Sequence, residues 1–149
     1  MVATLLPALG PSAAKLADRI RRQLGGNQAD GTVAQVHGDF SADQVLVSGT
    51  EVRLIDFDRS RGGSPESDLG SFAAVEEISH WRGTAVTTQH TQYLIEGYIQ
   101  AGGRLRPAAV DSWAAVRFFA NIVDPFRDRR PDWAGEMSRH LDRAVELIP

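Results

Sequence analysis

Two stretches of the sequence decide the fold: His37-Gly38-Asp39-Phe40-Ser41-Ala42-Asp43-Gln44 and Ile55-Asp56-Phe57-Asp58. Asp39 lies in a loop that Gly38 opens, and Gln44 stands at the root of the strand that follows. Asp56 ends the next strand, and antiparallel pairing should place it beside Gln44. An amide oxygen and a carboxylate suit Mg²⁺, which takes one or two protein carboxylates and fills its other positions with water and phosphate. Asp39 would lie one shell further out, free to accept a proton from a hydroxyl group.

Short β-prone runs surround these stretches. They cover residues 32–36, 44–47 and 51–55. Ser48-Gly49-Thr50 separates the last two runs and predicts a tight hairpin turn. The middle of the chain is therefore predicted to be a small β element, with residues 37–43 as the loop that leads into it.

Helices are predicted on both sides of this element. Apolar residues at three- and four-residue spacing indicate helices over residues 12–24, 68–81, 88–101 and 107–123, and a last helix that Pro131 opens. Gly25-Gly26 and Gly102-Gly103 end two of them. The fold class that follows is α+β, mostly helical, in a single domain over residues 1–149.

The composition is that of an ordinary globular domain. The 149 residues are 42% apolar and 23% charged with a net charge of −3, which excludes a disordered chain and argues against bulk attraction to nucleic acid or anionic lipid. The absence of cysteine excludes disulfides and a thiolate zinc site, and fits a cytoplasmic location. No apolar run is long enough to cross a membrane. Fifteen of the sixteen basic residues are arginine, so Lys15 is the one lysine that could take a catalytic role.

The arrangement of these motifs resembles the aminoglycoside phosphotransferase and choline kinase group of the protein-kinase-like fold. His37, Asp39 and Gln44 match the spacing of a kinase catalytic loop, and Ile-Asp-Phe-Asp stands where kinases have Asp-Phe-Gly. A third motif of the group is found in Gly63-Ser64-Pro65-Glu66-Ser67-Asp68-Leu69. The three motifs occur in order within 33 residues, and the resemblance covers roughly residues 10–149.

The resemblance implies a role for each matching residue. Asp39 would be the catalytic base or would orient the substrate hydroxyl, while Gln44 and Asp56 would hold Mg²⁺ against the phosphates of ATP. His37 would have a structural role, bonding the loop and the backbone around Asp56, and Asp68 would brace the catalytic loop.

The same resemblance divides the chain into three parts. Residues 10–36 would form a leading helix and strand, residues 37–58 the catalytic and metal loops, and residues 66–149 a helical subdomain on the substrate side. The helices from residue 88 onward would supply the acceptor pocket, with Asp111, Trp113 and Asp124 as candidates by location alone. The acceptor would be a small molecule with a hydroxyl group, among them aminoglycosides, choline-like amines and sugars.

The sequence departs from the family pattern in two places. Gln44 replaces the usual asparagine, and its longer side chain can still reach a metal. The N-terminal lobe of the fold has no counterpart before His37, and Lys15 lies on a helix, which is the wrong element for a phosphate-clamping lysine. A partner chain could supply that lobe, or the chain could be a truncated product of a longer gene. The alternative is a catalytically inactive pseudokinase that acts as a binding or dimerisation module.

Other polar residues have simpler interpretations. Asp58 is a candidate site residue that could instead pair with Arg59 or Arg61, and Asp39 and Asp56 could themselves be turn and strand-end residues with structural hydrogen bonds. The other histidines show no metal-ligand spacing, and the charged residues at 127–132 are typical of a solvated turn.

Overall fold

A computed structural model describes residues 1–26 and 33–148 of the chain. The chain forms helices α1 (Val2–Leu5), α2 (Gly10–Gly26), α3 (Glu66–Trp81), α4 (His90–Gln100), α5 (Pro107–Ala120), α6 (Asp124–Arg127) and α7 (Trp133–Leu147). Its strands are β1 (Ala34–Val36), β2 (Val45–Ser48), β3 (Glu51–Leu54) and β4 (Arg61–Gly63), with short 3-10 turns η1 (Pro7–Leu9), η3 (Ala42–Gln44) and η4 (Phe57–Arg59). The mostly helical α+β class predicted from the sequence is confirmed.

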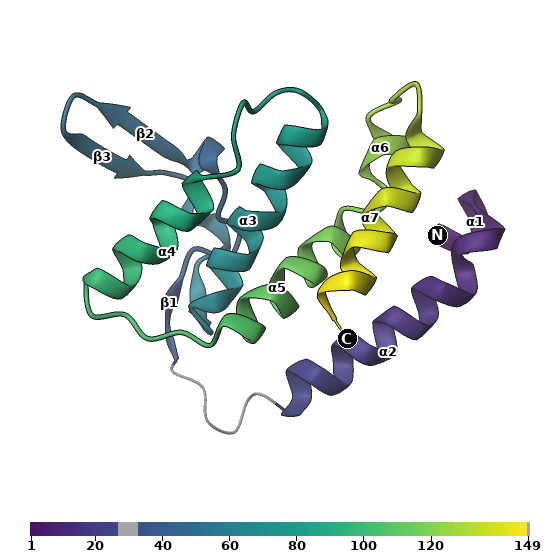
Figure 1. Ribbon diagram of the computed structural model, residues 1–149, viewed down its shortest axis with the longest axis horizontal. Coiled ribbons are helices and arrows are strands. Elements are labelled where there is room, and N and C mark those ends of the chain that lie inside the picture. The colour runs from purple at the N-terminus through teal and green to yellow at the C-terminus, as the bar shows by residue number, and fades with distance from the viewer. Residues whose placement is uncertain (27–32, 149) are drawn as a thin grey trace.

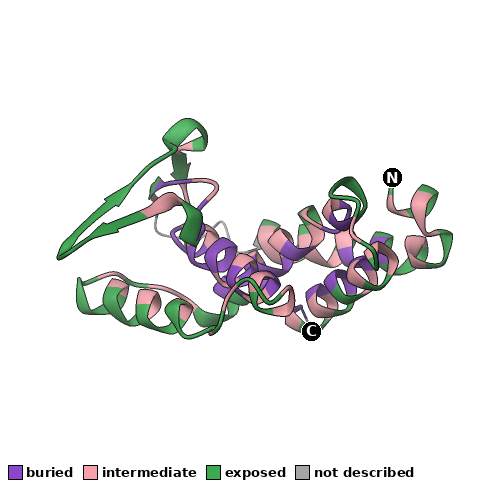
Figure 2. Cartoon of the chain, turned by 90° about the horizontal axis from the view of Figure 1, so that it is seen from above, coloured by how far each residue is buried: buried purple, intermediate pink, exposed green. Residues whose placement is uncertain are grey.

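The core lies between α2, α3, α5 and α7, which pack into one helical body (Figure 1). Leu16 of α2, Phe118 of α5, and Met137 and Leu141 of α7 are almost completely buried there. The ring of Trp81, at the end of α3, stacks on Phe118 at a centroid distance of 5.3 Å. Figure 2 shows the buried residues running through this helical body, with the hairpin on its flank nearly all exposed.

A close helix contact joins α3 to α5 at Gly70. A Cβ atom built on Gly70 would come within 2.6 Å of the backbone nitrogen of Ala114 and of the carbonyl oxygen of Val110. Real Cβ atoms keep further from their neighbours, so any larger residue would push the two helices apart. Gly70 therefore fixes how closely α5 approaches the helix that carries Asp68.

Two buried glutamates of α3 hold the beginnings of the next two helices. Glu76 accepts hydrogen bonds from the backbone nitrogens of His90 and Thr91, and from both of their side chains, at 2.6–3.1 Å. Burial alone would raise the pKa of Glu76, but these hydrogen bonds outweigh burial and hold the pKa below its usual value. Glu66 likewise accepts from the backbone nitrogen of Arg106, just before α5, at 3.1 Å.

The strands form two separate antiparallel pairs. β2 and β3 make the predicted hairpin, with Val45 opposite Leu54 and Ser48 opposite Glu51. The predicted strand at 32–36 is found as β1, whereas Thr32 lies outside the described residues. β1 pairs with β4, a strand that the sequence did not predict because Arg61-Gly62-Gly63 lacks apolar alternation.

The predicted helices are present with shifted ends. α3 begins two residues before the predicted start, α4 begins at His90, and α5 ends at Ala120 rather than at residue 123. The last helix begins at Trp133, two residues after Pro131, and the short α6 was not predicted. Among the described residues, no helix has both the length and the apolar character that crossing a membrane requires.

We expect Gly70→Ala to lower the free energy of unfolding by about 1–3 kcal/mol, because the added methyl group overpacks the contact between α3 and α5. Gly97→Ala is the matched control, since Gly97 lies within α4 and a Cβ there meets no atom within 4 Å. The control should raise stability by roughly 0.5–1 kcal/mol through helix propensity. Urea unfolding followed by circular dichroism measures both changes, and equal effects of the two substitutions would contradict the packing argument.

Candidate active site

The loop that begins at His37 is shaped by a glycine with a left-handed backbone. Gly38 has a φ of +84°, and a Cβ atom there would collide with the carbonyl oxygen of Arg59. Only glycine combines that backbone angle with so close an approach. The loop carrying Asp39 therefore lies directly against the turn that follows Asp56.

Asp68, in the first turn of α3, holds the start of this loop. Its carboxylate accepts hydrogen bonds from the backbone nitrogens of His37 at 2.6 Å and of Gly38 at 3.0 Å. Two amide donors on one carboxylate fix the direction in which the loop leaves β1. In the structure, Asp68 thus holds the start of the loop that carries Asp39.

His37 connects the loop to the end of the hairpin. Its Nε2 lies 2.8 Å from the carbonyl oxygen of Ile55, and because a carbonyl oxygen only accepts, Nε2 must carry the hydrogen. The ring is buried and packs against Phe40 and Phe57 at centroid distances of 5.6 and 4.9 Å. His37 thus joins the loop to the end of the hairpin through one hydrogen bond and two ring contacts.

Asp39 has two arginine partners that the sequence analysis did not name. Its Oδ1 lies 2.7 Å from Nη1 of Arg117 on α5, and its Oδ2 lies 3.1 Å from Nη1 of Arg59. Both oxygens of the Asp39 carboxylate therefore have a guanidinium partner within the protein. No local pattern pointed to Arg117, which follows Asp39 by 78 residues and reaches it only through the packing of α3 on α5.

Gln44 and Asp56 lie together at the base of the hairpin. The backbone nitrogen of Ile55 donates to the carbonyl oxygen of Gln44 at 3.1 Å, so Asp56 follows the residue opposite Gln44. Asp56 is exposed and has a left-handed backbone with a φ of 63°, a conformation that aspartate tolerates better than most residues. The two accessible oxygen donors fit the chemistry of Mg²⁺, which needs few protein ligands. In the described part of the chain, no three His, Cys, Asp or Glu side chains gather into a metal-binding group.

Asp58 does not form the ion pair that the sequence suggested as its alternative role. Within residues 1–26 and 33–148, the structure shows no ion pair for Asp58, while Arg59 turns to Asp39 and Arg61 donates to the carbonyl oxygen of Arg59 at 3.3 Å. Arg59 and Arg61, which follow the Ile-Asp-Phe-Asp motif, thus lie against the loop that carries Asp39.

A cavity of about 130 Å³ opens beside the loop, between α3 and α5. Trp113, one of the three acceptor-pocket candidates, lines it together with Gly38 and Arg117. Asp111 is exposed on α5 and is not in that lining, and Asp124 pairs with Arg127 at 3.3 Å. Lys15 is exposed on α2, which packs on α5 and α7 away from the hairpin (Figure 1).

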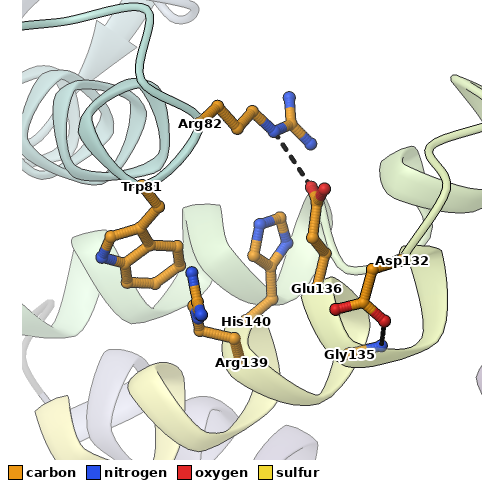
Figure 3. A pocket seen from close by; sticks show the side chains of 7 residues that line it. All are labelled: Trp81, Arg82, Asp132, Gly135, Glu136, Arg139 and His140. Atoms are coloured by element: carbon orange, nitrogen blue, oxygen red, sulfur yellow. Dashed lines mark hydrogen bonds and ion pairs between the residues drawn. The ribbon is translucent and has the colours of Figure 1, made fainter.

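A second cavity, of about 230 Å³, lies at the other end of α3 (Figure 3). Glu136 accepts there from Nε of Arg82 at 3.2 Å and from Nε of Arg130 at 2.9 Å. Burial, with Arg82 nearby, lowers the pKa of His140, although a hydrogen bond to the carbonyl oxygen of Asn121 opposes the shift. The 16 residues of α3 span about 24 Å, so this cavity is remote from Asp39 and is not part of the same site.

Comparisons with known proteins identify the family and the fold. The profile of the phosphotransferase enzyme family matches residues 2–119. A choline/ethanolamine kinase family protein from Mesorhizobium loti has a similar structure, with a TM-score of 0.64 and 20% sequence identity over 95% of this chain and 47% of that protein. A thermostable mutant of the aminoglycoside phosphotransferase APH(4)-Ia gives a TM-score of 0.57 and 17% identity over 95% of this chain and 44% of that protein. The chain thus spans less than half of either structure, and no curated protein matches the sequence.

Proposed function

The chain belongs to the phosphotransferase enzyme family, and we propose that it forms the catalytic half of a kinase. The reaction is transfer of the γ-phosphoryl group of ATP to a hydroxyl group of a small molecule. The observation that carries this proposal is the convergence of three sequence motifs on one place. Asp68 holds the loop that bears Asp39, and His37 ties that loop to the hairpin end that bears Gln44 and Asp56.

Asp39 orients the acceptor hydroxyl in this mechanism. A carboxylate offers about four lone-pair directions, and Arg59 and Arg117 each take one, so Asp39 keeps capacity to accept the hydroxyl hydrogen. The two guanidinium groups also hold the carboxylate in one orientation. Catalysis by the chain's residues then consists mainly of positioning, which is the dominant contribution in phosphoryl transfer.

Gln44 and Asp56 are the residues that would hold Mg²⁺. The ion supplies charge neutralisation on the phosphate oxygens when it is bound. Asp56 follows the hairpin and is the neighbour of Ile55, whose carbonyl oxygen accepts from His37. In this proposal, the metal-binding carboxylate of Asp56 and the hydroxyl-orienting carboxylate of Asp39 belong to the two segments that His37 joins.

The rest of the nucleotide site comes, in this proposal, from a second lobe. The chain covers less than half of the two similar structures, and its one lysine lies on α2, away from the hairpin. The lobe can belong to the same polypeptide or to a partner chain. We place the activity in the cytoplasm, where ATP and small hydroxylated metabolites are present together.

The direct test is calorimetric titration of the chain with ATP, with and without Mg²⁺. Asp56→Asn removes the negative charge, and asparagine tolerates the left-handed backbone. We expect this substitution to weaken Mg²⁺-dependent ATP binding about tenfold, which corresponds to ~1.4 kcal/mol. Asp43→Asn is the matched control, because Asp43 is an exposed carboxylate in the neighbouring turn η3. An ATP affinity that changes neither on adding Mg²⁺ nor on the Asp56 substitution would refute the proposed metal site.

One observation favours a second candidate function, a binding or dimerisation module without catalysis. The hairpin exposes several large apolar side chains at 43–68% of their surface: Leu46, Val47, Val52 and Leu54. Val47, Val52 and Leu54 share one face of the hairpin, while Leu46 lies on the other face. A contiguous exposed apolar face of this kind marks interaction sites more often than scattered single residues do.

Sedimentation velocity across a wide concentration range tests this second candidate. We expect Val52→Lys to weaken self-association, because Val52 lies opposite Val47 in the centre of the hairpin. Val86→Lys is the control, since Val86 is fully exposed but lies outside the hairpin. A monomer at every concentration would exclude homodimerisation through the hairpin.

A further inference from the structure

Three residues that line the cavity beside the catalytic loop carry buried polar atoms without hydrogen-bond partners. The atoms are Oγ of Ser67, Oγ of Ser71 and Nε of Arg117, and within the described residues none of the three has a partner. Ser71 is 8% exposed, so bulk water does not readily supply the missing hydrogen bond of its hydroxyl group. Buried polar groups are normally paired, and three unpaired groups around one cavity indicate that something binds there.

The cavity can hold a group of several non-hydrogen atoms. Its volume is about 130 Å³, whereas a single water needs only roughly 10–15 Å³ of such space. Trp113, Val116 and Ala120 of α5 contribute an apolar wall. The opposite side carries the two serines in the first turns of α3. The shape therefore suits a polar group attached to a small apolar body.

The charges that line the cavity favour an anion. Arg61 and Arg117 contribute two guanidinium groups. Asp68 is the one acidic side chain in the described lining, and Asp39, outside that lining, pairs with Nη1 of Arg117. Both carboxylate oxygens of Asp68 already accept from the backbone nitrogens of His37 and Gly38, so its charge is compensated locally. The groups that remain for a ligand are guanidinium and hydroxyl donors, which are the groups that bind carboxylates and phosphates.

Arg117 connects this cavity to the reacting end of the site. Its Nη1 lies 2.7 Å from Oδ1 of Asp39, while its unpartnered Nε belongs to the cavity lining. A ligand that binds Nε therefore contacts the same guanidinium group that pairs with Asp39. A hydroxyl group on the same ligand can then reach the carboxylate that orients it.

We propose that this cavity binds an oxyanion group of the acceptor, a carboxylate or a phosphate, through Arg117, Ser71 and Ser67, with Arg61 at its edge. The assignment of the bound molecule as acceptor rests on the proposed kinase function. It narrows the acceptor to anionic alcohols such as hydroxy acids or sugar phosphates. A choline-like amine, which the sequence resemblance allows, is a cation and would face two guanidinium groups.

The experiment titrates the ¹⁵N-labelled chain with inorganic phosphate, and separately with acetate, in the absence of Mg²⁺ and ATP. We expect saturable shifts of the Arg117 Nε–H signal and of the Ser71 amide. Ser71→Ala should weaken binding about tenfold, since it removes a hydrogen bond to a charged group. Ser79→Ala, on the same helix beyond the cavity lining, should leave binding unchanged. The probe that binds more tightly identifies the oxyanion as phosphate or carboxylate.

Two further variants separate this proposal from the kinase proposal and from effects on folding. Arg61→Gln changes an exposed residue of β4 and should also weaken phosphate binding, whereas Asp56→Asn should leave it intact. Shifts that do not saturate, or that persist in both Ser71→Ala and Arg61→Gln, would show that the anion does not bind in this cavity and would overturn the proposal. Shifts lost in Asp56→Asn but kept in Ser71→Ala would place the anion at the hairpin and overturn the proposal.

Discussion

The site depends on one carboxylate, that of Asp68, which accepts the backbone hydrogens of His37 and Gly38. These two hydrogen bonds tie the loop between β1 and the hairpin to the first turn of α3. Their direction, together with the left-handed backbone of Gly38, determines where Asp39 lies. The loop has little secondary structure of its own, so without this anchor the position of Asp39 would be set only by its flanking strands.

The same helix, α3, also positions the opposite wall of the site. Gly70 allows α5 to approach closely, and Glu66 holds the backbone just before α5 begins. As a result Arg117 of α5 reaches Asp39, which the loop presents from the other side. The loop, the end of the hairpin and α5 are therefore all held in place by one rigid element, α3, as the proposed positioning mechanism requires.

The sequence predicted those features that repeat locally. Apolar spacing located the principal helices, and the Ser48-Gly49-Thr50 turn located the hairpin and thereby the proximity of Gln44 to Asp56. It could not predict the contact between Arg117 and Asp39, because that contact depends on the tertiary packing of α5. The pairing of β4 with β1 was missed for the same reason. The glycines of β4 form a strand only because they pair with β1, where Gly62 lies opposite Gln35, 27 residues earlier. The two buried glutamates of α3 also gave no local signal, since their partners lie on α4 and before α5.

The measurement that tests this account most directly is hydrogen exchange of the His37 and Gly38 amides in the wild-type chain and in Asp68→Asn. A hydrogen bond to a charged group is worth about 1.5–3 kcal/mol, so we expect both amides to exchange roughly tenfold faster or more in the variant. Asp142→Asn, an exposed carboxylate of α7, is the control and should leave both rates unchanged. Equal protection of the two amides in wild type and Asp68→Asn would contradict the claim that this carboxylate holds the loop.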